Sequence, residues 1–310
     1  MNKNRKIKIG TRGSKLALWQ ANWVKSAIEQ GQQRDAELVI IKTKGDKIQD
    51  VPLAKVGGKG LFVKEIEEAM LDGRIDLAVH SMKDMPSEIP QGLCIGAIPE
   101  RENPKDVLIS KGRRRFERLP RNACIGTSSL RRRAQLLFKW PSLRIVPLRG
   151  NLDTRLKKLR TEELDAMILA AAGVIRLGLE DRISQYLNAD IMLPAVGQGA
   201  LCIEIRENDP DTGPVVSTLD HYETRRVVMG ERAFLRHLEG GCQVPIAAHG
   251  IFENKTFTLC GLVADPDGNT MLRETLSGPE EASEEIGVEL AEQLLAMGAK
   301  AILDNLRADA

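Results

Sequence analysis

The tripeptide Ile-Gly-Thr occurs twice in the chain, at residues 9–11 and 125–127. Each copy follows a short apolar run and precedes a segment with apolar residues at helical spacing, over residues 14–28 and 131–139. A strand that passes through a glycine turn into a helix is the start of a βαβ unit. The repeat therefore predicts two α/β lobes of similar construction. In the first helix, the buried stripe is expected to contain Leu16, Trp19, Trp23 and Ala27, with Ala17, Ala21, Val24 and Ile28 alongside.

The similarity between the two halves extends beyond the first strand and helix. Strand-like runs that end in a glycine turn occupy residues 38–46 and 143–150. Short apolar strands preceded by helices occupy residues 73–80 and 163–170. Alternating strands and helices predict largely parallel sheets, and such sheets bind ligands at the carboxyl ends of their strands. Two such lobes imply a cleft between them.

Two segments connect the predicted lobes, Pro99–Pro104 and Pro194–Gly199. Both are candidates for a hinge, although ordinary surface loops have a similar composition, and the sequence supports the two interpretations about equally. After the second connection, residues 201–205 are strand-like and are expected to return to the first lobe.

The C-terminal part has a different pattern, typical of a small α+β domain. A helix is predicted over residues 222–238, followed by strands over 244–251, 256–263 and 271–276 and a closing helix over 280–297 that ends at Gly298. The expected domains are residues 1–99 together with 200–219, residues 100–199, and residues 220–310.

Charge and cysteine content argue against several classes of protein. The net charge is +2 and aromatic residues make up 4% of the chain, which argues against a nucleic-acid binder. No apolar run approaches the ~20 residues that span a bilayer, and no signal-peptide pattern follows the amino terminus. The five cysteines include no CxxC pair and the four histidines form no metal motif. We therefore expect a cytoplasmic protein without a membrane partner, a disulfide framework or a structural metal.

Two loop segments could carry chemistry in the first half of the chain. The glycine-rich Val56–Gly60 contains Lys59 but lacks the spacing of a phosphate-binding P-loop, and a surface loop is its more common meaning. A lysine on such a loop would also suit a gate over an anionic cleft. Lys83 and Asp84 directly follow a predicted buried strand, where α/β sheets have their sites, although such a pair is often only a solvated surface feature.

Basic residues recur at the predicted carboxyl ends of strands. The run Arg131–Arg133 opens a helix, whose free N–H groups favour anions, and arginine adds paired donors for carboxylates. Arg149, Arg155 and Arg176 follow later strands, and Arg12 follows the first. A single arginine run is more often a solvated face, but this recurrence predicts a cleft for a polyanion.

Cys242 lies in a predicted tight loop just after a helix. Gly240 and Gly241 allow the backbone to turn sharply, and Pro245 prevents the helix from resuming. A lone cysteine is usually buried and inert, and no histidine lies beside this one to suggest a catalytic dyad. These observations leave its role open.

Seven motifs along the whole chain resemble one family. They are Gly10–Gln20, Leu53–Glu65, His80–Asp84, Gly126–Arg132, Leu148–Asn151, Leu193–Gly199 and Glu239–Pro245. In this order and at this length, they are similar to the motifs of the porphobilinogen deaminase (hydroxymethylbilane synthase) family. The resemblance implies an α/β fold of two similar periplasmic-binding-protein-like lobes flanking a cleft, plus a small α+β C-terminal domain.

The resemblance also implies a reaction and a cofactor. A dipyrromethane made from two substrate units would be attached to Cys242 through a thioether and serve as a primer. Four porphobilinogen molecules would be added to it head to tail, each losing ammonia, before water releases the linear tetrapyrrole hydroxymethylbilane. The family likeness further favours a monomer that takes part in haem biosynthesis.

Site residues follow from the same likeness. Asp84 matches the carboxylate that stabilises positive charge on a pyrrole nitrogen and moves the proton, Phe62 the ring that stacks on a pyrrole, and Lys59 a loop over the cleft. Each pyrrole carries two carboxylates, and burying these requires paired cations. Substrate and cofactor binding are expected at Arg12, Lys59, Phe62, Ser81, Lys83, Thr127, Ser129, Arg131, Arg132, Arg149, Arg155, Arg176 and Gln198.

A non-enzymatic binder is the main alternative. Two similar lobes joined by a hinge also describe a solute-binding protein or the sensor domain of a regulator. Such a protein has no need for the Gly-Gly-Cys loop at residues 240–242 in a third domain.

Overall fold

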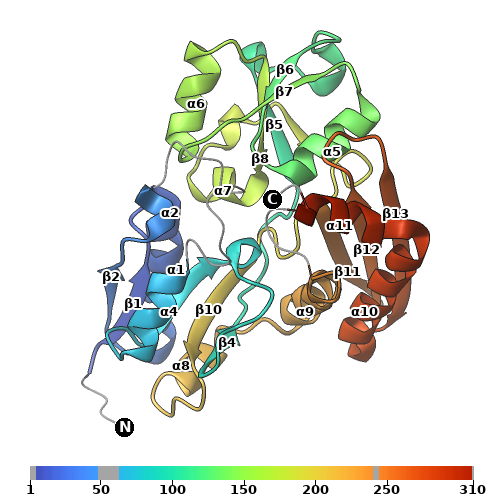
Figure 1. The fold of residues 1–310 in the computed structure, drawn as a ribbon. Coiled ribbons are helices and arrows are strands. Elements are labelled where there is room, and N and C mark those ends of the chain that lie inside the picture. Colours follow the sequence, from blue (N-terminus) through green and yellow to red (C-terminus); the bar gives the residue numbers. More distant parts are fainter. Residues whose placement is uncertain (1–4, 48–62, 240–243, 309–310) are drawn as a thin grey trace.

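The computed structural model describes residues 5–47, 63–239 and 244–308. Two five-stranded sheets form two lobes, and a three-stranded antiparallel sheet forms a third part beside them (Figure 1). These observations confirm the predicted fold class, two α/β lobes with a small α+β C-terminal domain. No helix in the described ranges is both long and apolar enough to cross a membrane.

The first lobe has the strand order β2-β1-β3-β10-β4. β1 runs parallel to β2 and β3, whereas β10 is antiparallel to both β3 and β4. The strands are β1 (Ile7–Thr11), β2 (Ala36–Ile40), β3 (Leu77–Ser81), β4 (Leu93–Ala97) and β10 (Leu201–Arg206). The helices are α1 (Lys15–Gln32), α2 (Lys44–Lys47), α4 (Lys64–Leu71), α8 (Gly213–Ser217) and the 3-10 turn η1 (Met82–Asp84).

The second lobe repeats this plan with the strand order β7-β6-β8-β5-β9. β6 is parallel to β7 and β8, and β5 is antiparallel to β8 and β9. The strands are β5 (Asp106–Ser110), β6 (Cys124–Gly126), β7 (Arg144–Val146), β8 (Ala166–Ala170) and β9 (Gln185–Leu187). The helices are α5 (Leu130–Lys139), α6 (Leu152–Thr161) and α7 (Ala171–Arg176), with 3-10 turns at Lys111–Arg113, Phe116–Arg118 and Glu180–Arg182.

The chain crosses between the lobes twice, through residues 99–104 and 194–199. The strand that follows each crossing, β5 or β10, enters its sheet antiparallel to the neighbouring strands. The two crossings lie side by side, because Glu102 N–H donates to the Gly199 carbonyl at 3.3 Å. Gly199 has φ +91°, and a Cβ there would lie 2.2 Å from the Glu102 carbonyl oxygen. A side chain at this position would therefore separate the two crossings.

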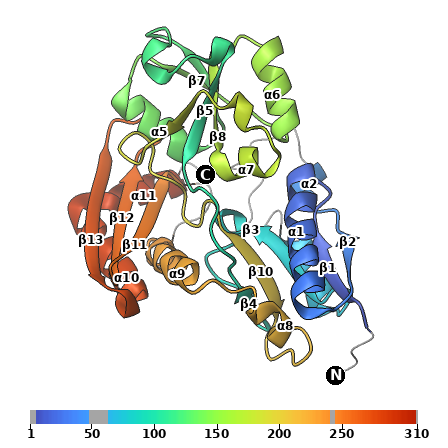
Figure 2. The same ribbon diagram turned by 180° about the vertical axis from the view of Figure 1, so that it is seen from behind.

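The third part packs two helices on one face of its sheet, as both views show (Figures 1 and 2). The strands are β11 (Ile246–Glu253), β12 (Thr256–Ala264) and β13 (Met271–Pro279). The helices are α9 (Tyr222–His237), α10 (Ser283–Leu294) and α11 (Lys300–Ala308), with a 3-10 turn at Glu280–Ala282 and a π-helical turn at Leu295–Ala299. Phe234 of α9 and Phe257 of β12 are fully buried in the core between helices and sheet.

Two expectations about helices are wrong in detail. α1 buries the stripe of Gln20, Ala21, Val24 and Ile28, whereas Trp19 and Trp23 are 38% and 40% exposed. The stripe that contains Ala21 and Val24 is therefore the buried one. Trp19 instead lies under the guanidinium of Arg176 from the second lobe, whose central carbon is 5.8 Å from the centre of the Trp19 ring. At the C-terminus, Gly298 does not end the helical region. Its φ of +107° bends the chain, and α11 then returns Leu303 to the core.

Candidate functional site

The carboxyl ends of β1 and β3 lie next to each other because these strands are parallel neighbours. Arg12 follows β1, Ser81 ends β3, and Asp84 ends the turn η1 that follows. These three residues line a pocket of about 70 Å³. The Asp84 side chain is exposed. The structure thus brings together three of the first-lobe residues that the motifs singled out.

Two residues of this pocket were missed by the sequence reasoning. Gln20 is buried in α1 and donates from Nε2 to the Ser81 hydroxyl at 2.9 Å. His80 precedes Ser81 on β3 and also lines the pocket. The signal for Gln20 was a polar residue on the same helical stripe as Ala21, Val24 and Ile28, and His80 opens the motif that ends at Asp84.

The second-lobe hydroxyls support the start of α5. Ser129 is the N-cap of this helix, and its hydroxyl accepts from Arg132 N–H at 3.4 Å. The buried Thr127 hydroxyl accepts from Ser129 N–H at 3.2 Å. Capping of this kind fixes the first turn of the helix. Both hydroxyls hold the turn from which the two arginines extend.

A buried carboxylate, Asp106, pairs with both arginines. Arg131 Nη1 lies 2.8 Å from Oδ2, and Arg132 contacts Oδ1 through Nη2 at 2.7 Å and Nε at 3.0 Å. Arg132 Nη1 donates to the Ile168 carbonyl, so all three of its nitrogens donate within the protein. Burial opposes ionisation of Asp106, but the two arginines lower its pKa to about 2.

Gln198 belongs to the same buried network. Its Nε2 donates to the Pro104 carbonyl at 2.7 Å and to Asp106 Oδ1 at 3.2 Å. The side chain is fully buried in the second crossing. Its predicted role in ligand binding stays a prediction, since the contacts seen here fix the crossing to Asp106.

Lys83 connects the charges of the two lobes. It is partly exposed, and burial followed by the charges of Arg132 and Arg131 lowers its pKa to about 8. Asp84 and Asp106 act in the opposite direction. The charges of these second-lobe arginines therefore influence the protonation of Lys83 in the first lobe.

Arg155 and Arg176 extend the cationic surface. Arg155 donates from Nε to the Gly150 carbonyl at 2.8 Å. Burial, then Arg132 and Arg149, lower its pKa to about 10, against the effect of Asp84 in the first lobe. Arg176 donates to the Gly199 carbonyl at 2.7 Å, and burial lowers its pKa to about 10. Asp84 thus influences the pKa of one cation in each lobe, Lys83 in the first and Arg155 in the second.

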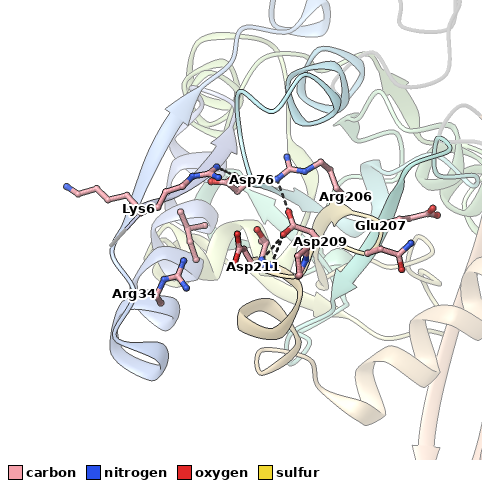
Figure 3. A pocket seen from close by; sticks show the side chains of 12 residues that line it. Lys6, Arg34, Asp76, Arg206, Glu207, Asp209 and Asp211 are labelled. Carbon is pink, nitrogen blue, oxygen red and sulfur yellow. Dashed lines mark hydrogen bonds and ion pairs between the residues drawn. The ribbon is translucent and has the colours of Figure 1, made fainter. Parts of the chain in front are cut away.

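A larger pocket, of about 360 Å³, lies at the opposite end of the first sheet (Figure 3). It is lined by residues that precede β1 and β3 and by those that follow β10. Its charges are largely paired with one another, since Arg206 bonds to Asp209 at 2.8 Å and lies 3.4 Å from Asp76. None of the predicted site residues that the structure describes is among those that line it. Lys59, Phe62 and Cys242 lie outside the described residues.

Comparison with known families identifies the chain. The family model described as "Porphobilinogen deaminase, dipyromethane cofactor binding domain" matches residues 7–213. The model described as "Porphobilinogen deaminase, C-terminal domain" matches residues 226–296. The chain belongs to the porphobilinogen deaminase family.

Individual relatives agree with this assignment. The chain is 56% identical over 301 residues to the porphobilinogen deaminase of Syntrophotalea carbinolica, covering 97% of this chain and 96% of that protein. It is 54% identical over 306 residues to that of a Geobacillus species, covering 98% of each. Among solved structures, the methionine-binding protein MetQ aligns with a TM-score of 0.45 at 14% identity over 69% of this chain and 89% of that one.

The family defines the reaction. The enzyme is a transferase of tetrapyrrole and haem biosynthesis that joins four porphobilinogen units head to tail on a dipyrromethane primer, with loss of ammonia, and releases hydroxymethylbilane. The donor set fits such a primer. Burial lowers the pKa values of Lys83, Arg155 and Arg176, and carboxylates placed beside these cations would offset that effect.

Proposed function

We propose that Asp84 is the catalytic carboxylate and that Cys242 holds the primer. The observation that carries the first assignment is the position of Asp84, exposed in a pocket at the carboxyl end of β3 and within the field of cations from both lobes. When ammonia leaves porphobilinogen, positive charge develops on the pyrrole nitrogen. A carboxylate beside that nitrogen lowers the barrier by stabilising the charge.

The cations have a different role. Arg12, Lys83, Arg149, Arg155 and Arg176 would pair with the acetate and propionate groups of the bound pyrroles. Bound dipyrromethane supplies a pyrrole carbon as the nucleophile for the first addition. Arg131 and Arg132 both pair with Asp106. We therefore assign to them the positioning of the start of α5 in addition to binding the carboxylates of the pyrroles. Ser81, Thr127 and Ser129 would add hydroxyl or backbone donors, and Lys59, Phe62 and Gln198 complete the proposed binding set.

We also propose the division of the chain into residues 1–99 with 200–219, residues 100–199 and residues 220–310. Sheet membership supports it, because β10 lies in the first sheet although it follows the second lobe in sequence. A monomer in the cytoplasm fits the family likeness.

The intact mass of the denatured protein tests the attachment. We expect an excess equal to two deaminated porphobilinogen units in the wild-type enzyme and its loss in Cys242→Ser. Cys260→Ser, in the same domain, is the matched control and should keep the excess. Active wild-type protein with an unmodified mass would overturn the proposal.

A further inference from the structure

Three ionisable side chains gather inside the first lobe, beside the pocket of Asp84. They are Glu67 of α4, His80 of β3 and Glu204 of β10, with exposed fractions of 8%, 7% and 0%. The register of the antiparallel pair places Cys202 opposite His80 and Glu204 opposite Ala78. His80 and Glu204 are therefore diagonal neighbours on one face of the sheet, and His80 Nε2 lies 3.0 Å from Glu204 Oε2.

The two carboxylates of this cluster are incompletely satisfied. Oε1 of Glu67 and Oε1 of Glu204 are buried without a hydrogen-bond partner among the described residues. An ionised carboxylate in such a position is costly, so the cluster favours binding a proton. Burial, and then the charge of Glu204, raise the pKa of Glu67 to about 7, while His80 acts in the opposite direction. In the described ranges, no group of His, Cys, Asp and Glu side chains is arranged to hold a metal ion.

His80 connects this cluster to the pocket. It lines the pocket together with Arg12, Ser81 and Asp84. Nε2 of His80 forms a hydrogen bond with Glu204. Within the described part of the chain, the other ring nitrogen, Nδ1, has no hydrogen-bond partner. The imidazole is thus the one member of the cluster that borders both the ligand space and the buried carboxylates.

We propose that His80 is a second proton-transfer residue of this site, with Glu204 as its positioning residue and Glu67 as the group that stores the proton. The inference rests on the proposed function of the Asp84 pocket. It divides the chemistry between two groups: Asp84 stabilises the cation, and the His80 cluster removes the proton that each addition releases.

Each addition releases one proton, which a nearby base can take up. The bond from the porphobilinogen methylene carbon to its protonated amine nitrogen breaks, the electron pair stays with the nitrogen, and ammonia leaves with the positive charge remaining on the pyrrole. That methylene carbon forms a bond to the free α-carbon of the acceptor pyrrole, and the C–H bond at the α-carbon then breaks. His80 takes this proton and passes it to the Glu67–Glu204 pair, and the pair returns it through His80 to the released ammonia, which leaves the pocket as ammonium before the next addition.

The charges around the cluster set the direction of its pH dependence. Arg12 and Asp84 line the same pocket as His80, and Glu68 follows Glu67 on α4. Glu67 can accept the proton from His80 only when its own carboxylate is ionised. The rate of addition should therefore rise as pH increases through about 7. Glu204→Gln removes a negative charge that raises the pKa of Glu67, and this rise in rate should then move to lower pH.

The first test is a titration of the holoenzyme that does not depend on activity. The ¹³C carboxyl signal of Glu67, assigned by its loss in Glu67→Gln, should titrate near neutral pH. His80→Gln should move this titration to higher pH and Glu204→Gln to lower pH. A Glu67 signal that titrates in the ordinary range of a glutamate, or that does not respond to His80→Gln, would overturn the inference.

The second test is the pH dependence of single-turnover addition. His80→Gln should lower the rate about 100-fold and remove the dependence near pH 7. Glu67→Gln, which removes a buried charge and keeps the shape, should also remove that dependence. Exposed Asp72→Asn also removes one negative charge, just after the end of α4, but Asp72 is not among the charges that shift the pKa of Glu67, so the profile should stay as in the wild type. If His80→Gln does not fold, Glu67→Gln carries the test alone.

Failure of this inference can be told from failure of the proposed function. A His80→Gln holoenzyme with the full primer mass, a uniform rate loss at every pH and an unmoved profile would show a structural role and contradict the inference. An unmodified mass in active wild-type protein, or normal turnover in Asp84→Asn, would instead contradict the proposed function.

Discussion

Asp84 influences the pKa of two cations, one in each lobe. It acts on the pKa values of Lys83 in its own lobe and of Arg155 in the other, in both cases favouring the cation. The carboxylate itself is exposed at the end of a three-residue turn. An exposed carboxylate in this position is accessible to a positive charge that develops on a bound pyrrole.

Asp84→Asn should keep the fold and lose most of the activity. The amide has the same shape but neither the charge nor the basicity, so we expect turnover to fall about 100- to 10,000-fold. Steady-state turnover at neutral pH, with primer loading checked by intact mass, measures this. Asp72→Asn, an exposed acid of the same lobe, is the control. Near-normal turnover in Asp84→Asn would remove it from the chemistry.

At the scale of elements, α5 is fixed to β5 by one buried carboxylate. Asp106 is the first residue of β5 and pairs with Arg131 and Arg132 in the first turn of α5. Gln198 joins this network from the second crossing. The orientation of the basic helix therefore depends on the first residue of β5.

Asp106→Asn should destabilise the protein by about 3–5 kcal/mol, because two buried guanidinium groups lose their counter-charge. Urea unfolding at pH 7 measures the loss, with the exposed Asp190→Asn as control. The pKa of Asp106 is lowered, so its stabilising effect is complete above about pH 4 and is lost as pH falls toward 2. The gap between variant and wild type should shrink in that window. An equal gap at pH 7 and pH 2.5 would contradict this assignment.

At the scale of the whole molecule, Glu231 of α9 holds both crossings. One oxygen accepts from Arg101 Nη1 at 2.7 Å and the other from Gly197 N–H at 2.7 Å. Arg101 belongs to the first crossing and Gly197 to the second, while Gly250 N–H of β11 donates to the same carboxylate at 2.8 Å. A movement of one lobe relative to the other would therefore have to change the hydrogen bonds that Glu231 makes with the two crossings and with β11.

Glu231→Gln should loosen both crossings together. The buried carboxamide presents a donor to groups that are already donors, so we expect a loss of about 3 kcal/mol in the free energy of unfolding. Amide hydrogen exchange should rise in residues 99–104 and 194–199 at once. Glu223→Gln, exposed in the first turn of the same helix, should leave both unchanged. A rise in only one crossing would show that Glu231 does not couple them.

Much of the fold could be predicted because its signals are local. The repeated Ile-Gly-Thr, the apolar runs of the strands and the turn residues between them gave the two lobes and the α+β part. The predictions failed where tertiary packing determines which side chains are buried. Nothing in α1 distinguishes the stripe containing Trp19 and Trp23 from the one containing Ala21 and Val24 until the sheet and the second lobe are in place.

The candidate site shows the same division. The motifs named Arg12, Ser81, Lys83 and Asp84, and the fold brings Arg12, Ser81 and Asp84 to one pocket. They did not reveal that Arg131 and Arg132 share Asp106, which lies 25 residues from Arg131 in the chain. Their roles in binding, like those of Lys59, Phe62 and Cys242, stay predictions.

The sequence by itself determined the alternation of strands and helices, the family and the residue types of the site, because these depend on neighbours in the chain. Only the tertiary structure decided which charges meet. The pairs of Asp106 with two arginines, of Glu231 with both crossings, and of His80 with Glu204 are all contacts between residues far apart in sequence. Charged groups need partners only once folding removes them from water, so their pairing depends on the packed molecule.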